Sequence, residues 1–198
     1  TWIPFNLTSD DLEDVTFLDT NTGLIVGDDG RIFRTTDSGA TWSQVVSGTD
    51  VNLEGVAFGT NGYAYIAGRD GHVLRSTDNG QTWSILATGD ARYRAAFAVG
   101  TTHAWVVGNE GVMLATADGG ATWSSQSTGA DSDLHDVFFL DTKTGWVVGQ
   151  NDVVYKTTDG GSSWALMNSG VNVSLESVVF TDASFGMAVG ESGRSFHT

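Results

Sequence analysis

Apolar residues in this chain gather in short segments that return at a regular interval. The first segment of each interval begins at one of Leu12, Leu53, Tyr93, Leu134 and Leu175. A second apolar run follows each of these and ends at a glycine, at Gly27, Gly68, Gly108, Gly149 and Gly190. Short segments rich in β-branched and aromatic residues are typical of strands. No stretch keeps a 3.6-residue apolar period long enough to predict a helix.

A polar tip and a third segment complete the pattern. The tips read DDG, RDG, NEG, QND and ESG, and the third segments read RIFRT, HVLRS, VMLAT, VVYKT and RSFHT. A glycine at the last tip position suits the left-handed conformation of a hairpin loop, and Asp152 in the fourth repeat is among the few other residue types that tolerate it. Each repeat therefore predicts a β-hairpin between its second and third strands.

The pattern Ser/Thr-x-Asp-x-Gly-x-Thr/Ser-Trp follows the third segment in four repeats, at 35–42, 76–83, 116–123 and 157–164. The chain begins with the last two residues of this pattern, so that tryptophans recur at Trp2, Trp42, Trp83, Trp123 and Trp164, 40 or 41 residues apart. A repeat of this length made of short strands is typical of a propeller blade. We predict an all-β fold, a five-bladed β-propeller of four-stranded antiparallel blades.

The chain is expected to form a single domain. Its blade repeats cover about 10–48, 51–89, 91–129, 132–170, and 173–198 plus 1–8. In the last of these, Ile3 to Leu7 would add the fourth strand, close the ring and remove two open sheet edges.

The repeated motif has a structural interpretation that we favour over a catalytic or calcium-binding one. Its aspartate can accept backbone N–H bonds within its own turn, its glycine permits the tight backbone, and its indole is expected to pack towards a neighbouring blade. The residues concerned are Asp37, Gly39 and Trp42; Asp78, Gly80 and Trp83; Asp118, Gly120 and Trp123; and Asp159, Gly161 and Trp164. An active site rarely needs equivalent residues in every repeat.

Composition narrows the function classes. The net charge is −15 with only two lysines, whereas nucleic-acid binding needs a basic stripe, so we expect no nucleic-acid partner. The chain has no cysteine, which excludes thiolate metal sites, disulfides and cysteine nucleophiles. The histidines His72, His103 and His197 are scattered over different repeat positions and predict no metal site, and we expect no cofactor. No apolar run reaches the length of a membrane span, so we expect no membrane-spanning segment. We also expect the protein to be a monomer.

The motif resembles the Asp-box, or BNR, repeat. The longer pattern VGDDGRIFRTTDSGATW at 26–42, with its copies, resembles the photosystem II stability/assembly factor family of propellers. This resemblance covers essentially the whole chain. It implies a binding or assembly scaffold, and it favours an extracytoplasmic location (periplasmic, lumenal or secreted).

A candidate ligand site follows from how propellers usually bind. The loops that enter the first strands and the tips share one face, and ligands usually meet that face near the axis. The second position of each first strand supplies Glu13, Glu54, Arg94, His135 and Glu176, and Arg92 lies beside them. Further charged residues are expected around this mouth, namely Asp10, Asp11, Asp50, Asp90, Asp131, Asp133, Asp28, Asp29, Arg69, Asp70, Glu110, Asp152 and Glu191.

This mouth could bind a protein or peptide segment, a basic peptide end, a small polar ligand or a glycan. Alternatively, its charges only balance one another between blades. Trp105 and Trp146 could stack on sugars, but an always-large repeat position favours a role in the inter-blade core. A sialidase-type glycosidase would need an arginine cluster and a tyrosine nucleophile, and only Tyr93 lies near the mouth. We therefore expect a non-catalytic scaffold, with a lectin-like propeller or degenerate glycosidase as the alternative.

Overall fold

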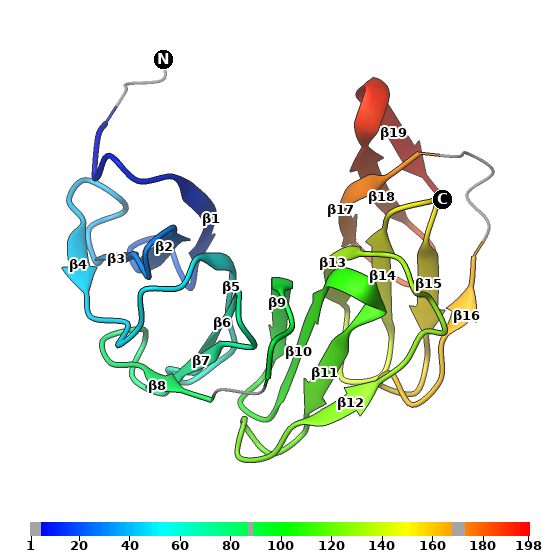
Figure 1. Ribbon diagram of the computed structural model, residues 1–198, viewed down its shortest axis with the longest axis horizontal. Coiled ribbons are helices and arrows are strands. Elements are labelled where there is room, and N and C mark those ends of the chain that lie inside the picture. Colours follow the sequence, from blue (N-terminus) through cyan, green and yellow to red (C-terminus); the bar gives the residue numbers. More distant parts are fainter. Residues whose placement is uncertain (1–4, 87–88, 168–172) are drawn as a thin grey trace.

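The computed structural model of the chain describes residues 5–86, 89–167 and 173–198. These residues form five antiparallel sheets that follow one another along the sequence, each folded as a meander. We call them blades 1 to 5. They are arranged in an arc, from blade 1 in blue to blade 5 in red (Figure 1).

The strands of each blade are numbered in chain order. Blade 1 contains β1 (Leu12–Phe17), β2 (Gly23–Gly27), β3 (Ile32–Thr35) and β4 (Ser43–Val45). Blade 2 contains β5 (Leu53–Phe58), β6 (Ala64–Gly68), β7 (Val73–Ser76) and β8 (Ser84–Ile85). Blade 3 contains β9 (Tyr93–Val99), β10 (His103–Gly108), β11 (Met113–Thr116) and β12 (Ser124–Gln126). Blade 4 contains β13 (Leu134–Phe139), β14 (Gly145–Gly149), β15 (Val154–Thr157) and β16 (Ala165–Leu166). Blade 5 contains β17 (Leu175–Phe180), β18 (Gly186–Gly190) and β19 (Arg194–His197). Two single 3₁₀ turns, η1 (Asn109–Gly111) and η2 (Glu191–Gly193), form the tips of blades 3 and 5.

The all-β propeller architecture and its five blades are thus as predicted, but the last blade differs from the other four. Blades 1 to 4 have four strands each, whereas blade 5 has three in the described part of the chain. The predicted fourth strand, Ile3 to Leu7, begins outside the described residues, and Phe5 to Leu7 form no strand. Closure of the ring by this segment stays a prediction.

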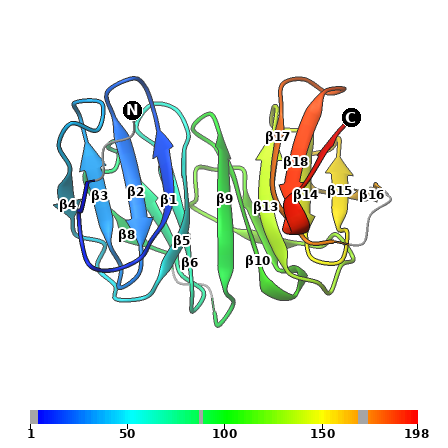
Figure 2. The ribbon, with the colours of Figure 1, turned by 90° about the horizontal axis from the view of Figure 1, so that it is seen from above.

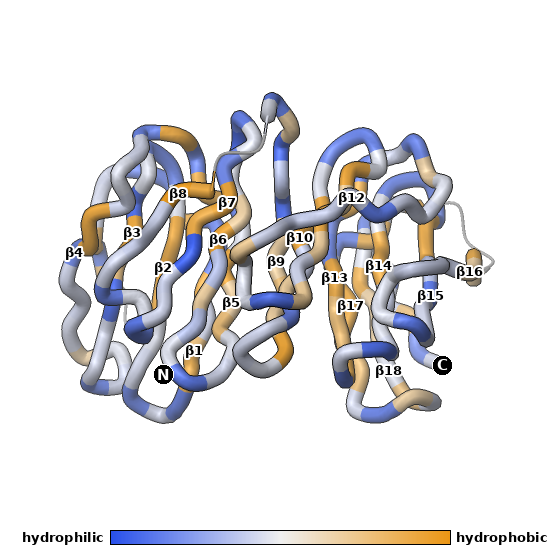
Figure 3. Tube along the Cα trace, turned by 90° about the horizontal axis from the view of Figure 1, so that it is seen from below, coloured by the Kyte–Doolittle hydropathy of each residue, from blue (hydrophilic) through white to orange (hydrophobic). Residues whose placement is uncertain are grey.

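The blades pack through their first strands. β1 packs on β5, β5 on β9, β9 on β13, and β13 on β17. Figure 2 shows the five sheets side by side, with β1 and β17 separated by the blades between them. Each boundary between neighbouring blades holds one cluster of buried apolar side chains, so the core is divided into four seams. Figure 3 shows that hydrophobic residues gather on the strands and hydrophilic residues on the loops.

The repeated motif builds the same turn four times. In blade 1, the Asp37 carboxylate accepts hydrogen bonds from the Thr41 backbone N–H (2.8 Å), the Thr41 hydroxyl (2.6 Å) and the Thr35 hydroxyl (2.8 Å). The Thr35 hydroxyl also accepts the N–H of Gly39, whose φ of +84° is left-handed. The turns at Asp78, Asp118 and Asp159 repeat these contacts. These contacts are the ones that the structural interpretation of the motif predicts.

Three tryptophans of the motif, Trp83, Trp123 and Trp164, pack at the seams, whereas Trp42 packs edge-on against Phe17 of its own blade. Trp83 packs against the buried cluster between blades 1 and 2, and Trp123 lies edge-on to Tyr65 of blade 2, with ring centroids 5.8 Å apart. Trp105 and Trp146 belong to the same cores, with exposures of 1% and 2%. Both rings are therefore covered by protein and offer no face to a sugar.

Candidate functional site at the channel mouth

The tips and the entering loops meet at one end of the strands in every blade, as predicted from the sequence. Tips bond to the loop that enters the next blade: the Gly30 N–H donates to the Val51 carbonyl, the Gly71 N–H to the Ala91 carbonyl, and the Asp152 N–H to the Val173 carbonyl. At the other end, the motif turns bond to the hairpins between first and second strands, as the Ser38 N–H does to the Asn21 carbonyl. Scaffold turns and candidate site are thus at opposite ends of the strands. We call the end with the tips and the entering loops the mouth. It contains the five second-position residues and the charged tips and loops around them.

The five second-position residues occupy a β-bulge in every blade. The pairing of first and second strands skips one residue each time: Glu13, Glu54, Arg94, His135 and Glu176. A bulged residue is unpaired in the ladder, and its side chain is re-aimed. Sequence position alone did not reveal this irregularity, although the glycine that closes each second strand is a signal of it. In Gly108 and Gly149, a Cβ atom would collide with the carbonyl oxygen of the residue before the first strand.

Glu54 binds two arginines, Arg69 from the tip of its own blade 2 and Arg92 across the seam, from the loop that enters blade 3. Its carboxylate lies 2.5 Å from Arg69 Nε and 2.9 Å from an Arg92 guanidinium nitrogen, and its side chain is only 8% exposed. Burial alone would raise the pKa of Glu54, but the hydrogen bonds from Arg92 and Arg69 outweigh it and hold the pKa below its ordinary value. Glu54 therefore stays ionised and fixes both guanidinium groups.

The other second-position residues pair across the next two seams. Arg94 of blade 3 contacts Asp133 at 3.1 Å and donates to the Asn109 side chain at 2.6 Å. The His135 ring nitrogen Nδ1 lies 3.2 Å from the Glu176 carboxylate and 3.0 Å from the Leu175 carbonyl. The predicted ring is thus a series of pairs between neighbouring blades.

Glu13 stands apart from these pairs. It is exposed and forms no hydrogen bond or ion pair within the described part of the chain. Partial desolvation of its carboxylate, followed by the nearby charges of Glu54 and Asp28, raises its pKa. The mouth therefore repels an added negative charge at this position.

The charges of the mouth are unevenly available to solvent. Four of its arginines, Arg31, Arg69, Arg92 and Arg94, are half-buried and bound to carboxylates, whereas Arg194 is exposed. The exposed carboxylates are more numerous: Asp11, Glu13, Asp29, Asp50, Asp70, Asp90, Glu110, Asp131, Glu176 and Glu191. The surface that a ligand meets is consequently acidic.

Two half-buried aspartates on the first strands, Asp14 and Asp136, were not predicted as site residues. They follow the bulge in β1 and β13, and each accepts two N–H groups, one from the next residue of its own strand and one from the first strand of the next blade. The Asp14 carboxylate accepts the Val56 N–H at 2.8 Å, and Asp136 accepts the Val178 N–H at 2.8 Å. Burial raises the pKa of both carboxyls, and these hydrogen bonds oppose the rise. These hydrogen bonds join neighbouring first strands across a seam. Blades 2 and 3 have Gly55 and Ala95 at the equivalent position, and these residues have no carboxylate to form such bonds.

Neither a metal site nor a membrane span is found in the described residues. Within the ranges that the structure covers, no three histidine, aspartate or glutamate side chains lie close enough together to hold a metal ion. Within the same ranges, no helix has the length and apolarity needed to cross a membrane.

Comparison with solved structures supports the fold. A structure described as YCF48 bound to D1 peptide superposes with a TM-score of 0.76 at 23% identity, covering 97% of this chain and 64% of that one. YCF48 from Cyanidioschyzon merolae superposes with a TM-score of 0.55 at 17% identity, covering 97% of this chain and 96% of that one. An ancestral GH74 enzyme gives a TM-score of 0.68 at 16% identity, covering 96% of this chain and 31% of that one. At these identities the likeness shows the fold alone.

Comparison of sequences identifies the family. No curated protein matches the chain. A family model described as photosynthesis system II assembly factor YCF48 matches residues 1–93, 85–168 and 123–198, which together span the chain. The chain therefore belongs to the family of photosynthesis system II assembly factor YCF48.

Proposed function

We propose that this protein is a non-catalytic scaffold that binds a peptide segment at its mouth, and that the segment is positively charged. The observation that carries the proposal is the asymmetry of the mouth charges. Its half-buried arginines are bound to carboxylates of their own or a neighbouring blade, while many other carboxylates face solvent. A cationic ligand meets unpaired charges there, whereas an anionic one meets repulsion.

The family supports a peptide rather than another ligand. A related structure with the same fold is described as bound to D1 peptide, and this chain spans 64% of the length of that protein. The lysine or arginine side chains of a peptide, or its amino terminus, would lie over Glu13 and the tip carboxylates. An assembly role at an extracytoplasmic location is part of the same proposal.

Sugar binding and glycoside hydrolysis receive less support from the geometry. Lectin-like sites stack aromatic faces on sugars, but Trp105, Trp146 and Tyr93 are at most 2% exposed. Glu54 is held by two arginines, and a lowered pKa is the opposite of what a general acid at neutral pH requires. The fold shared with an ancestral GH74 enzyme carries no catalytic residue over to this chain.

Isothermal titration calorimetry tests the proposal with three synthetic peptides of one length, rich in lysine and arginine, neutral, or rich in glutamate. We expect binding of the basic peptide alone. Glu13→Gln removes one exposed charge without breaking an ion pair and should weaken binding about 3- to 10-fold, the range of a single partly screened charge.

Asp182→Asn is the matched control, because it removes one charge at the opposite end of the strands. Its side-chain oxygen can still accept the Ser184 and Phe185 N–H bonds. Equal loss of affinity in the two variants would show a nonspecific charge effect and contradict a site at the mouth. Turnover of a fluorogenic glycoside that depends on mouth carboxylates would contradict the non-catalytic role.

A further inference from the structure

Six glycines of this chain directly follow an asparagine or an aspartate, and the backbone N–H of five of them is bound within the protein. The Gly80 N–H donates to the Ser76 hydroxyl at 2.9 Å. Four others donate to backbone carbonyl oxygens at 2.7 to 2.9 Å, namely those of Gly30, Gly71, Gly119 and Gly160. The sixth is Gly62, whose N–H donates to no acceptor in the described part of the chain. It follows Asn61, so an unbound amide lies next to an asparagine side chain.

Asn61 and Gly62 form the turn between the first and second strands of blade 2. Their φ angles of +53° and +91° are both left-handed, as in the type I′ turn that Asn-Gly favours. The Tyr63 N–H donates to the Thr60 carbonyl at 3.2 Å and closes the turn. The Asn61 side chain is exposed and forms no hydrogen bond within the residues that the structure describes. One long backbone bond therefore holds this turn closed.

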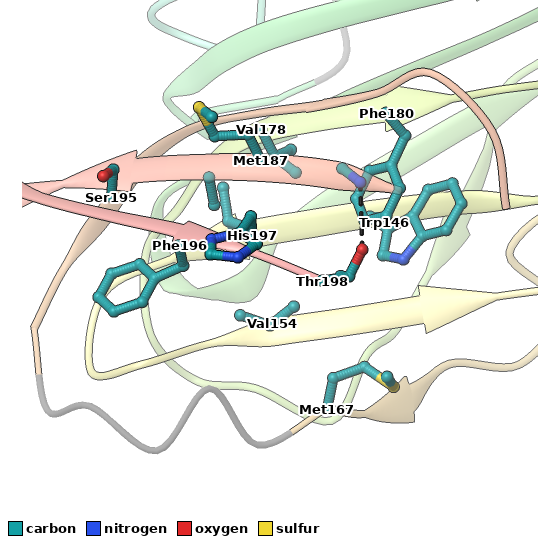
Figure 4. Close-up of a pocket in the computed structure, with 13 residues that line it drawn as sticks. Trp146, Val154, Met167, Val178, Phe180, Met187, Ser195, Phe196, His197 and Thr198 are labelled. Carbon is teal, nitrogen blue, oxygen red and sulfur yellow. Dashed lines mark hydrogen bonds between the residues drawn. The ribbon is translucent and has the colours of Figure 1, made fainter. Parts of the chain in front are cut away.

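The equivalent turns of blades 1, 4 and 5 have an acceptor that blade 2 lacks. In each of them, an aspartate carboxylate accepts the N–H at the position of Gly62, at 2.7 or 2.8 Å; these residues are Asp19, Asp141 and Asp182. In blade 5 a further bond follows the turn: the Gly186 N–H donates to the Thr198 hydroxyl at 3.2 Å, drawn as a dashed line in the pocket of Figure 4. Blade 2 has Thr60 at the position of the aspartate, so the Gly62 N–H has no carboxylate to bind.

The second Asn-Gly pair of the chain provides an internal comparison. Asn79 and Gly80 belong to the motif turn of blade 2, where the Gly80 N–H is bound by Ser76. The Asn79 carbonyl accepts a hydrogen bond from Arg34 Nε at 2.7 Å. A Cβ atom added at Gly80 would lie 2.7 Å from Leu24 Cδ2, so the turn is also packed against blade 1. The same dipeptide is thus held firmly here and loosely at Asn61.

We propose that Asn61 is a site of spontaneous deamidation. The Gly62 backbone nitrogen attacks the side-chain carbonyl carbon of Asn61. Its proton passes through solvent to the leaving amide nitrogen, which departs as ammonia while a five-membered cyclic imide closes. Water then opens the imide at either carbonyl and yields aspartate or isoaspartate, with no oxidant or reductant involved. Glycine favours the attack, because it has no side chain to obstruct its nitrogen.

The rate of this step depends on how easily the turn opens. Gly62 is buried in the left-handed turn, which must open before its nitrogen reaches the Asn61 side chain. Local opening costs the hydrogen bonds that it breaks. The Gly62 N–H has none to lose within the described residues, whereas the Gly80 N–H must leave Ser76 before Asn79 can react.

The product would alter the end of the strands opposite to the mouth. The Thr60 N–H donates to the Gly100 carbonyl of blade 3 at 2.8 Å, and the Asn79 N–H donates to the Gly62 carbonyl at 2.9 Å. Isoaspartate at Asn61 adds a methylene to the main chain between these two bonds and would displace them. The modified protein should unfold at a lower urea concentration, with peptide binding at the mouth unchanged, so this inference is independent of the proposed function.

Peptide mapping of the folded protein, incubated in mildly alkaline buffer, tests the site. Trypsin places Asn61 in the peptide 35–69 and Asn79 in the peptide 76–92, so mass spectrometry follows the two separately. Digestion in heavy-oxygen water marks any deamidation that arises during preparation. The same incubation in urea gives the rate at each asparagine without the fold. We expect the fold to slow Asn79 at least about 10-fold more than Asn61. Equal protection of the two asparagines, or greater protection of Asn61, would overturn the proposal.

Two variants test the role of the amide acceptor in opposite directions. Thr60→Asp supplies the carboxylate that blades 1, 4 and 5 have, and should slow the reaction at Asn61 about 2- to 10-fold. Thr60→Ala is its matched control and should leave the rate unchanged. Ser76→Ala removes the acceptor of the Gly80 N–H and should speed the reaction at Asn79 about 2- to 10-fold, with Asn61 unaffected. The same rate at Asn61 in Thr60→Asp and Thr60→Ala would contradict the free Gly62 amide as its cause.

Discussion

The indole of Trp105 in blade 3 lies face to face on the ring of Phe139 in blade 4, with centroids 3.6 Å apart and planes inclined by 9°. The Trp105 N–H also donates to the Gly160 carbonyl in the motif turn of blade 4 at 3.2 Å. This one side chain thus joins the apolar seam to the repeated turn. The same stacking recurs between Trp146 and Phe180, so this contact is a repeated feature of the packing between blades.

Truncation of this stack should be costly. Trp105→Ala and Phe139→Ala are each expected to lower the free energy of unfolding by about 3–5 kcal/mol, because both leave a cavity in a closed seam. A double-mutant cycle in urea should give a coupling energy of about 0.5–1.5 kcal/mol for the ring pair. Phe17→Ala is the matched control. Phe17 is 45% exposed and has no preceding blade in the described chain, so its loss should cost clearly less. Equal costs for Phe17 and Phe139 would contradict the seam account.

The motif aspartates should make the protein sensitive to acid. The hydroxyl of Thr122, then its N–H and the Thr116 hydroxyl, lower the pKa of Asp118 to about 2, and Asp159 is lowered to about 2 in the same way. The unfolded chain binds these protons first, near pH 4, so the stability that the carboxylates provide is complete above pH 4 and is lost as the pH falls to about 2. Asp118→Asn should flatten the dependence of the urea midpoint on pH between 4 and 2. An unchanged slope would count against the hydrogen-bonded turn as its origin.

The half-buried Asp136 should show the opposite dependence. Burial raises its pKa, while the hydrogen bonds from Val178, Ser177 and Val137 oppose the rise. Its contribution to stability is therefore greatest below the unfolded pKa near 4 and decreases as the pH rises through the folded value. Asp136→Ala should cost about 1–3 kcal/mol, because the Val178 N–H loses its acceptor. Chemical denaturation at pH 4 and pH 7 checks the sign: a larger cost at pH 7 would refute it.

The pairing at Glu54 predicts a change in ligand preference. Glu54→Ala releases Arg69 and Arg92 from their shared carboxylate and makes the mouth less acidic. Binding of a basic peptide should weaken by more than the Glu13→Gln variant shows, and an acidic peptide should gain measurable affinity. Arg31→Gln is a useful comparison, because it frees the Asp10 carboxylate beside blade 1, makes the mouth more acidic and should leave the acidic peptide unbound. Calorimetry on the three variants gives the answer, and unchanged affinities throughout would remove Glu54 from the site.

The sequence predicted those features that each repeat encodes by itself. The strands, the tips and the motif turns depend on residues a few positions apart, such as Thr35, Asp37 and Gly39, and the structure reproduces them. The burial of Trp105 and Trp146 was also predictable from the sequence, because a repeat position that always carries a large side chain is typical of the core between blades.

Features formed between blades were harder to predict. The hydrogen bond from the Val56 N–H to the Asp14 carboxylate joins residues that are 42 positions apart in the sequence, and no local sequence pattern predicts it. The pairing of Glu54 with Arg92 depends on how blades 2 and 3 are inclined to each other, as does the curvature of the arc. That inclination is set by the summed packing of whole seams, so the pairing within the mouth had to come from the structure. Closure by Ile3 to Leu7 depends on the same curvature.

Hydrogen–deuterium exchange with and without the basic peptide tests the central claim most directly, because it locates the bound segment on the chain. The account predicts new protection at the tips of blades 1 to 3, around residues 28–30, 69–71 and 109–111, and none at the motif turns at 37–41 and 118–122 at the opposite end. Protection at the motif turns, or no protection at the tips at saturating peptide, would contradict a scaffold that binds through its mouth.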